Sequence, residues 1–293
     1  AGQLLAPLAL GALSYAPIAG GSGDHKQLPP IGRCEKRESR RMRTDSIDPD
    51  QLQPLSVSLF EILYERLKGS DCAVGLKEQY RMNAPICQVA SLKWYEDSLK
   101  PANDVIAGAR LDLVRHADDP AWAILDPAQP VVLVDSPPDP EGGPRTNSSE
   151  AAMIVTCLAS MEKAGFQLKR QPRGTVASVA IISPYRAQVA LLRRMLTAKF
   201  GDREGFWREA VDTVDRFQGG EARIVFISLA SNGVPSPHVS DEHRLNVAFT
   251  RAKHKLIILG NKAALEKDPV FYALFGIMDE ALPYRQWLQV WQA

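Results

Sequence analysis

From residue 131 onward, short apolar runs alternate with longer amphipathic segments. The apolar runs cover residues 131–134, 176–182, 224–229 and 256–259. They are rich in Val, Ile and Leu and do not alternate strictly with polar positions, which is typical of strands buried on both faces. Strands that alternate with helices indicate a parallel sheet covered by helices on both sides. The pattern therefore predicts an α/β fold.

Two of the intervening helices carry recognisable start signals. One is predicted to begin at Asn147, with Glu150 three residues later as a capping-box partner, and to stop at Gly165. The other is predicted to have Ser183 as its N-cap and Pro184 at its first position. Their expected apolar faces are Ala151, Ile154, Val155 and Leu158 in the first helix, and Val189, Leu192 and Leu196 in the second.

The chain before residue 131 is less regular. Residues 2–13 are predicted to form an apolar helix, residues 32–54 a polar connector, and residues 56–67 an amphipathic helix with Leu59, Ile62 and Leu63 inward. Within the connector, residues 33–43 hold six basic and two acidic side chains. A solvated loop is favoured there over a nucleic-acid contact, because most charge runs are solvated.

Composition narrows the class of protein. With 293 residues, 45% hydrophobic and 24% charged, the chain matches ordinary globular proteins, which excludes a disordered chain, a collagen or a disulfide scaffold. The net charge of +1 leaves a local basic groove possible. Residues 1–23 carry no charge, but Pro and Gly interrupt them, so a buried segment is favoured over a signal peptide or membrane span. Four Cys without a C-x-x-C pair favour reduced thiols in a cytoplasmic protein.

Five segments place residues suited to phosphate at the end of an apolar run. They cover residues 23–30, 79–82, 183–188, 212–221 and 244–253, and the first follows a strand expected to end near Ala19. Ligands of an open parallel sheet bind beyond the carboxyl ends of its strands. We therefore expect these segments to converge on one edge of the sheet and to form a nucleotide site.

The first two segments offer phosphate and base contacts. The amide of Gln27 can donate to a terminal phosphate or orient a water. Arg81 has a planar fork suited to phosphate, and Tyr80 has a ring on which a base can stack. Taken singly, Gln27 is equally explained by a polar turn, and Tyr80 with Arg81 by a surface packing pair.

The other three segments add backbone and charge. The N–H groups after Ser183 form an anion site, although Ser183 alone can be a simple helix cap. Gly220 allows close backbone approach, and Glu221 can accept from a ribose hydroxyl. Arg244 and Arg251 are expected on one helix face, pointing to one cleft, with a solvated basic face as the alternative.

The order of these segments resembles a known family. GDHKQLPP, QYRM, VDTVDRFQGGE and RLNVAFTRAK resemble motifs III, IV, V and VI of the superfamily 1 helicases, in the branch of the nonsense-decay RNA helicases and their DNA-unwinding relatives. The resemblance runs from Ala1 to about Asn261. It implies a complete second RecA-like domain over residues 73–293. Residues 1–72 would then be the C-terminal remnant of the first RecA-like domain, with motif III and a connector.

The resemblance also implies residue roles. Gln27 would sense the γ-phosphate of ATP, Tyr80 would stack on adenine, and Arg81 and Arg251 would act as arginine fingers. The implied catalytic residues are Gln27, Arg81 and Arg251; the implied nucleotide-binding residues are Tyr80, Gly220, Glu221 and Arg244; the implied nucleic-acid-binding residues are Ser183, Tyr185, Arg186 and Thr213.

One family element is missing from the sequence. There is no G-x-x-x-x-G-K-[ST] phosphate loop, and the acidic pair that holds Mg²⁺ is expected upstream of Ala1. We therefore expect a C-terminal fragment, inactive alone, of an ATP-dependent and Mg²⁺-dependent helicase. Its expected partners are single-stranded DNA or RNA and the missing N-terminal RecA-like domain, without a membrane. The alternatives are a non-hydrolysing module that binds nucleic acid or a partner and, less favoured, a small-molecule nucleotide enzyme.

Overall fold

The computed structural model describes residues 15, 18–29, 58–114, 118–140, 142–143, 145–169, 175–217, 219–282 and 287–289. The chain divides into two compact units, Ala1–Leu76 and Lys77–Ala293. The predicted helix over 2–13 and the Arg-rich segment 33–43 lie outside the described residues. That the two units correspond to a domain remnant and a complete RecA-like domain stays a prediction.

The first unit contains one described helix, α3 (Leu59–Leu67). Its N-cap is Ser58, whose hydroxyl accepts a hydrogen bond from the backbone N–H of Glu61 at 3.0 Å. The inward orientation predicted for Leu63 is wrong, because that side chain is 40% exposed. Residues 18–29 form no strand, and most of the strand expected to end near Ala19 lies outside the described residues.

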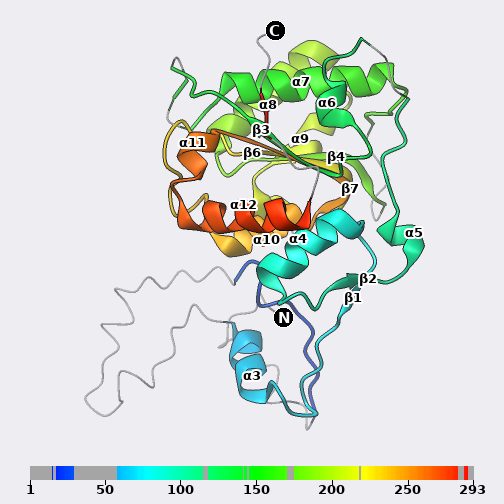
Figure 1. The fold of residues 1–293 in the computed structure, drawn as a ribbon, viewed down its shortest axis with the longest axis vertical. Coiled ribbons are helices and arrows are strands. Elements are labelled where there is room, and N and C mark those ends of the chain that lie inside the picture. The colour runs from blue at the N-terminus through cyan, green and yellow to red at the C-terminus, as the bar shows by residue number, and fades with distance from the viewer. Residues whose placement is uncertain are drawn as a thin grey trace. The chain divides into compact units, whose positions relative to one another are not determined.

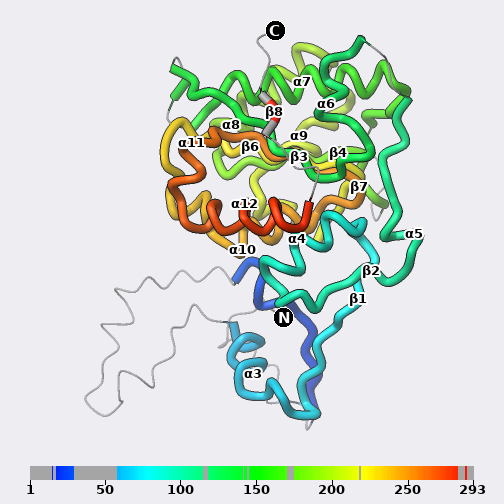
Figure 2. Tube along the Cα trace, in the orientation of Figure 1, coloured from blue at the N-terminus to red at the C-terminus, as the bar shows by residue number. Residues whose placement is uncertain are grey.

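The second unit is built on six parallel strands in the order β5-β4-β6-β7-β3-β8. Along the chain they are β3 (Val131–Asp135), β4 (Ala177–Ile182), β5 (Val211–Asp212), β6 (Ala222–Ser228), β7 (Ala252–Gly260) and β8 (Trp287–Gln289). Strands β6 and β7 lie between β3 and β4 in the sheet, and Figure 2 traces the chain through these strands. The predicted α/β fold with a parallel sheet is confirmed.

Helices cover both faces of this sheet (Figure 1). On one side lie α6 (Trp122–Leu125), α7 (Ser148–Lys163), α8 (Arg186–Phe200) and α9 (Phe206–Ala210); on the other lie α4 (Ala84–Trp94), α10 (Glu242–Phe249) and α12 (Pro269–Ala281). The shorter elements are α5 (Asp104–Ala107), α11 (Lys262–Leu265), η2 (Val214–Arg216) and a separate parallel pair, β1 (Glu78–Gln79) with β2 (Lys100–Pro101).

The core explains why the strands lack alternation. Val132 and Val134 belong to the cluster that packs under α7 and α8. The intervening Val131 and Leu133 are equally buried, at 2% and 1% exposure. Because successive side chains point to opposite faces, both faces of β3 are covered and both must be apolar.

The two predicted helix starts have different outcomes. Asn147 is the N-cap of α7, and its side chain accepts from the backbone N–H of Glu150 at 2.9 Å, as predicted. The carboxylate of Glu150, however, is buried and bonds elsewhere. Helix α8 begins two residues later than predicted, with Tyr185 as its N-cap. The reason is that Ser183 still extends the sheet, since its N–H donates to the carbonyl of Asp212 at 3.2 Å.

Candidate functional site

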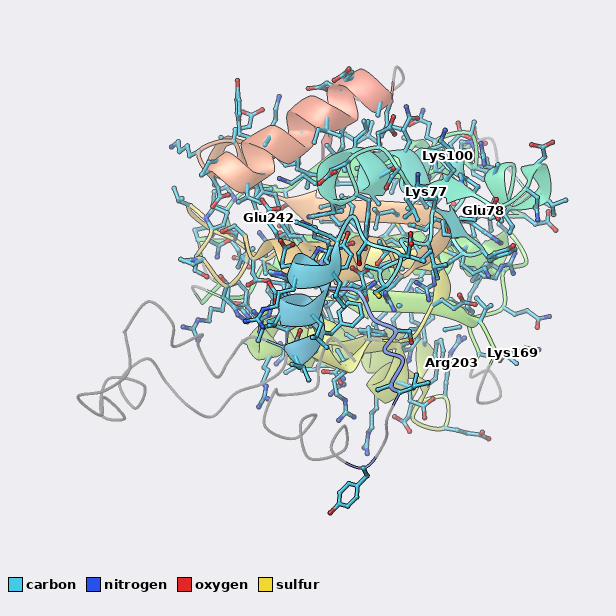
Figure 3. The ribbon with its side chains drawn as sticks, turned by 90° about the horizontal axis from the view of Figure 1, so that it is seen from below. Lys77, Glu78, Lys100, Lys169, Arg203 and Glu242 are labelled. Carbon is cyan, nitrogen blue, oxygen red and sulfur yellow. The ribbon has the colours of Figure 1, made fainter. Side chains whose placement is uncertain are left out.

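The motif QYRM forms a turn that its own glutamine holds in shape. The Gln79 Oε1 accepts from the backbone N–H of Arg81 at 2.8 Å and of Met82 at 2.7 Å. Met82 is buried, whereas Tyr80 is 68% exposed. Lys77, Glu78 and Lys100 lie together at the β1 and β2 pair that leads into this turn (Figure 3). The turn therefore presents Tyr80 and Arg81 from a fixed base.

Asn83 attaches this turn to the sheet. Its side-chain amide donates to the carbonyls of Ala109 and His254, each at 2.9 Å. Its backbone N–H donates to the carbonyl of Lys253 at 3.0 Å, and it is the N-cap of α4. The position of Arg81 relative to β7 is thus set by buried hydrogen bonds.

Arg81 reaches across to the motif V glutamate. Its Nε lies 3.0 Å from the Glu221 Oε2, and its Nη1 donates to the carbonyl of Thr250 at 3.0 Å. The Nζ of Lys253 lies 3.3 Å from the other oxygen of Glu221. Partial burial opposes ionisation of Glu221, but the hydrogen bonds and charges of Arg81 and Lys253 outweigh it, so the pKa of Glu221 is lowered. The carboxylate bridges two cations.

Arg251 is buried beside this pair, at 2% exposure. Its guanidinium donates to the carbonyls of Val247 and Gly220, both at 3.0 Å, and to the Thr250 hydroxyl at 3.2 Å. The structure therefore brings together residues from motifs IV, V and VI. We call this set the arginine cluster; it consists of Arg81, Gly220, Glu221, Thr250, Arg251 and Lys253.

Arg244 lies outside the arginine cluster, contrary to the expectation that it points to the same cleft as Arg251. Helix α10 ends at Phe249, so Arg251 lies beyond it and the two arginines do not share a helix face. The guanidinium of Arg244 lies 3.6 Å from the carboxylates of Asp215 and Asp241. Its Nε is buried without a hydrogen-bond partner. Arg244 thus links motif VI to η2 in motif V.

The predicted nucleic-acid residues lie at the carboxyl ends of β4 and β5. Ser183 and Thr213 each follow the last residue of these paired strands. Arg186 is exposed at the first position of α8, and the Tyr185 ring lies 5.9 Å from the Arg145 guanidinium. Ser183 is fully buried, and its hydroxyl accepts from the backbone N–H of Tyr185 at 3.4 Å. Its side chain shapes the start of α8 and is not on the surface.

The four segments that lie in the second unit do not converge on one edge of the sheet, so the predicted convergence is wrong for them. Glu221 precedes β6 and Arg251 precedes β7, so the arginine cluster lies at the amino ends of the strands. Tyr185 and Thr213 lie at the carboxyl ends. Strand β6 has 7 residues, which at about 3.3 Å per residue separate the two ends by roughly 20 Å. The sequence alone did not reveal that Glu221 of motif V and Arg251 of motif VI each lie directly before a strand of the sheet.

Gln27 lies in the first unit and is described there. Its side-chain amide donates to the Asp24 Oδ2 at 2.9 Å, and the Lys26 N–H donates to the Asp24 Oδ1 at 2.9 Å. Asp24 thus holds a compact turn. Among the residues that the structure describes, no three His, Cys, Asp or Glu side chains form a metal site. No helix of that part has the length and apolar character to span a membrane.

Three participants were missed at the sequence level. Gln79 shapes the turn, while Thr250 and Lys253 complete the arginine cluster. Each could have been found from the sequence, because each lies inside one of the motifs, one or two positions from Arg81 or Arg251. Their backbone and charge roles became visible only when the motifs were placed together.

Comparisons with known proteins identify the family. Residues 55–263 match the AAA domain family. The chain is similar to the mouse protein "DNA replication ATP-dependent helicase/nuclease DNA2", with 31% identity over 94% of this chain and 25% of the mouse protein. The human protein of the same name is 32% identical over 92% of this chain and 25% of its own length. The chain thus spans about a quarter of these relatives.

A looser likeness to a solved structure adds nothing to this assignment. The alignment with the arterivirus nonstructural protein 10 helicase covers 84% of this chain and 34% of the viral chain, at 18% identity and a TM-score of 0.33. The family match spans more than half of the chain and includes motifs IV, V and VI. The chain therefore belongs to the AAA domain family, among the superfamily 1 helicases.

Proposed function

We propose that this chain is the part of an ATP-dependent helicase or translocase that supplies arginine fingers and single-strand contacts. One observation carries the proposal. Arg81 and Arg251, which are far apart in the sequence, both bond to Thr250, one at its carbonyl and the other at its hydroxyl. Two guanidinium groups are thus held next to each other, as a shared phosphate ligand requires.

The charges of the arginine cluster suit a nucleoside triphosphate. Arg81, Arg251 and Lys253 carry three positive charges, against the single carboxylate of Glu221. Tyr80 adds an exposed ring for the base. Phosphate oxygens compete with Glu221 for Arg81, which frees the carboxylate for a ribose hydroxyl. An ATP-bound Mg²⁺ would take its protein ligands, a phosphate-loop hydroxyl and an acidic side chain, from a first RecA-like domain.

Arg81 is the finger that can act directly. Its side chain is 29% exposed, so it can turn toward a γ-phosphate held by a first RecA-like domain and stabilise the charge that develops there. Arg251 must first exchange the Gly220 carbonyl for a phosphate oxygen. Until then it holds the Gly220 turn. Gln27 would contribute from the first unit, and Arg244 would support motif V through Asp215.

Single-stranded nucleic acid would lie across the carboxyl ends. The first N–H groups of α8 face there without a side-chain cap, which suits a phosphate. Arg186 supplies an exposed charge, Tyr185 a ring, and Thr213 a hydroxyl. Because the arginine cluster lies roughly 20 Å away at the other ends of the strands, ATP turnover and strand grip would be linked through β4 and β6.

The test is nucleic-acid-stimulated ATPase activity of this chain joined to a first RecA-like domain that carries a phosphate loop. Arg81→Ala should lower kcat at least 100-fold with a small change in KM, as loss of an arginine finger does. Arg208→Ala, an exposed arginine of α9, is the matched control and should keep normal turnover. Normal turnover in Arg81→Ala and in Arg251→Ala would refute the proposal.

The strand contacts have their own test. Arg186→Ala should weaken binding of a fluorescent oligothymidylate and reduce the slope of log K against log salt by about 1. We call Tyr185, Arg186 and Thr213 the strand site, meaning the site for a nucleic-acid strand. An unchanged slope would remove Arg186 from the strand site.

One observation favours a second candidate, a binding module without hydrolysis. Arg251 is buried and satisfied by protein acceptors. An enzyme whose second arginine never leaves these acceptors would bind ATP without fast turnover. The same ATPase assay separates the two candidates, since this module would show no stimulation by nucleic acid.

A further inference from the structure

A buried carboxylate joins three segments at the carboxyl ends of the sheet. Glu150, in the first turn of α7, is fully buried. Its Oε1 accepts from the Ser136 hydroxyl at 2.9 Å, and its Oε2 accepts from the Ser228 hydroxyl at 2.6 Å and from the Ala230 backbone N–H at 3.0 Å. Ser136 follows β3 and Ser228 ends β6. One side chain therefore connects two strand ends and the loop after β6.

This arrangement is costly, which argues that it serves a purpose beyond packing. Burial disfavours the charged form of Glu150 and raises its pKa to about 7, although the hydrogen bonds from Ser228, Ala230 and Ser136 oppose that rise. All three donors are neutral. An apolar side chain at this position would leave two hydroxyls and the Ala230 N–H without this acceptor, so Glu150 is held there for its hydrogen bonds.

A second buried side chain extends the connection to α8. Gln188 donates to the Ser228 hydroxyl at 3.0 Å and to the Asn147 carbonyl at 2.9 Å, and it accepts from the Asn147 N–H at 2.9 Å. It lies in the first turn of α8, two residues after Arg186. The Ser228 hydroxyl therefore links Glu150 to Gln188, in the helix turn that presents Arg186.

One residue of the loop over residues 229–241 has an unfavourable backbone conformation. Ala230 has φ of 46°, a left-handed value that costs a residue with a Cβ roughly 1–2 kcal/mol. The hydrogen bond from its N–H to Glu150 compensates. Further along this loop, Asn232 donates to the carbonyls of Gly143 at 3.2 Å and Thr146 at 3.1 Å. The next residue back from Thr146 is Arg145, the cation over the Tyr185 ring.

The same loop also contacts the segment that leads into α8. The His238 Nε2 lies 3.3 Å from the Pro184 carbonyl. The loop thus contacts the strand site from two directions, through Thr146 beside Arg145 and through Pro184 beside Tyr185. Ala230 is two residues before Asn232, so a shift of Ala230 would reach the Thr146 contact directly.

We propose that Glu150 is a positioning residue for the strand site, and that it acts by fixing Ala230 and, with it, the loop over residues 229–241 against Pro184 and Thr146, the neighbours of Tyr185 and Arg145. Arg145 then belongs to the strand site as a further cation, although no motif assigns it. The ligand in this inference rests on the proposed function. The geometry of the loop does not rest on that function, so the proposed function and the positioning role of Glu150 can fail separately.

The experiment uses the 293-residue chain with two readouts. Binding of a fluorescent oligothymidylate reports on the strand site, and amide hydrogen exchange of residues 229–241 reports on the loop. Glu150→Ala should weaken binding about 10-fold and speed exchange in the loop. Glu150→Gln should stay within about 2-fold on both, because its amide oxygen can accept from Ser228 and Ala230 while its NH₂ donates to Ser136.

Ser136→Ala is the matched control. It removes one hydrogen bond to Glu150 on the side away from the loop, so it should cost stability without changing binding or loop exchange. If Glu150→Ala does not fold, Glu150→Asp provides the shorter carboxylate without a large cavity and should change both readouts in the same direction.

The outcomes distinguish the inference from the function. Unchanged loop exchange in the folded Glu150 variants overturns the positioning role, whatever the chain binds. Faster loop exchange with unchanged binding also overturns it, because the loop would then not serve the strand site. A wild-type chain that binds no oligothymidylate refutes the strand-binding function, while the exchange data still test the loop.

Discussion

Replacing Arg251 by Ala should destabilise the second unit strongly, whatever its effect on turnover. In the structure the guanidinium of Arg251 is buried and donates to Gly220, Val247 and Thr250. Alanine removes all three hydrogen bonds. It also leaves the Gly220 turn without its attachment to the residues after α10.

The magnitude follows from these contacts. A hydrogen bond from a charged donor contributes about 1.5–3 kcal/mol, but the acceptors do not all stay unsatisfied. Gly220 is exposed, so its carbonyl can bond to water, and the Thr250 hydroxyl already bonds to Asn246 at 2.7 Å. Three such bonds would sum to about 4.5–9 kcal/mol, and because two of the acceptors find other partners we expect less than that sum, about 3 kcal/mol. For a unit of this size that corresponds to a fall in Tm of roughly 6–12 °C.

Thermal unfolding followed by circular dichroism measures this change. Arg81→Ala, at a side chain that is 29% exposed, should lower Tm much less, because partly exposed ion pairs contribute only about 1 kcal/mol or less. Arg251→Lys should fall between wild type and Arg251→Ala, since one ammonium cannot reproduce the planar fork. A shift of 2 °C corresponds to less than about 1 kcal/mol of stability. A Tm of Arg251→Ala within 2 °C of wild type would therefore refute the burial and the hydrogen bonds described for Arg251.

Three further predictions concern stability. The pKa of Glu150 is about 7 in the folded state against 4.5 ordinarily. Its contribution to the free energy of unfolding is therefore fully present below pH 4.5, and about 3 kcal/mol of it is lost as the pH rises to 7. Glu150→Gln should flatten this part of the pH profile of stability in urea unfolding, and an unchanged profile would contradict the burial of Glu150. Lys255 has the opposite sign, because burial lowers its pKa from 10.5 to about 7: stability is lost as pH falls from 10.5 to 7, and Lys255→Met should remove that dependence in the same assay. Ala230→Gly should raise the free energy of unfolding by about 1 kcal/mol, since glycine adopts a left-handed φ without strain; a lower free energy would count against the strained loop.

The strands and several helix boundaries were predictable from local pattern. Residues 131–134 and 256–259 became β3 and β7 because uninterrupted apolar runs of that length are stable only between two layers of helices. Asn147 became an N-cap because its side chain satisfies a free N–H at the helix start. The start of α8 was mispredicted, because a hydrogen bond from Ser183 to a neighbouring strand overrode the local cap signal.

Family membership and the identity of the candidate residues follow from short motifs, since motifs are local in the chain. The grouping of those residues is not local. Arg81, Glu221 and Arg251 meet at the amino ends of β6 and β7, while Tyr185 and Thr213 lie at the opposite ends. Which side chains share a partner depends on strand order and register, and these arise only when the sheet forms. The buried position of Glu150 has the same origin, because three segments that are separate in the chain enclose it only in the folded state.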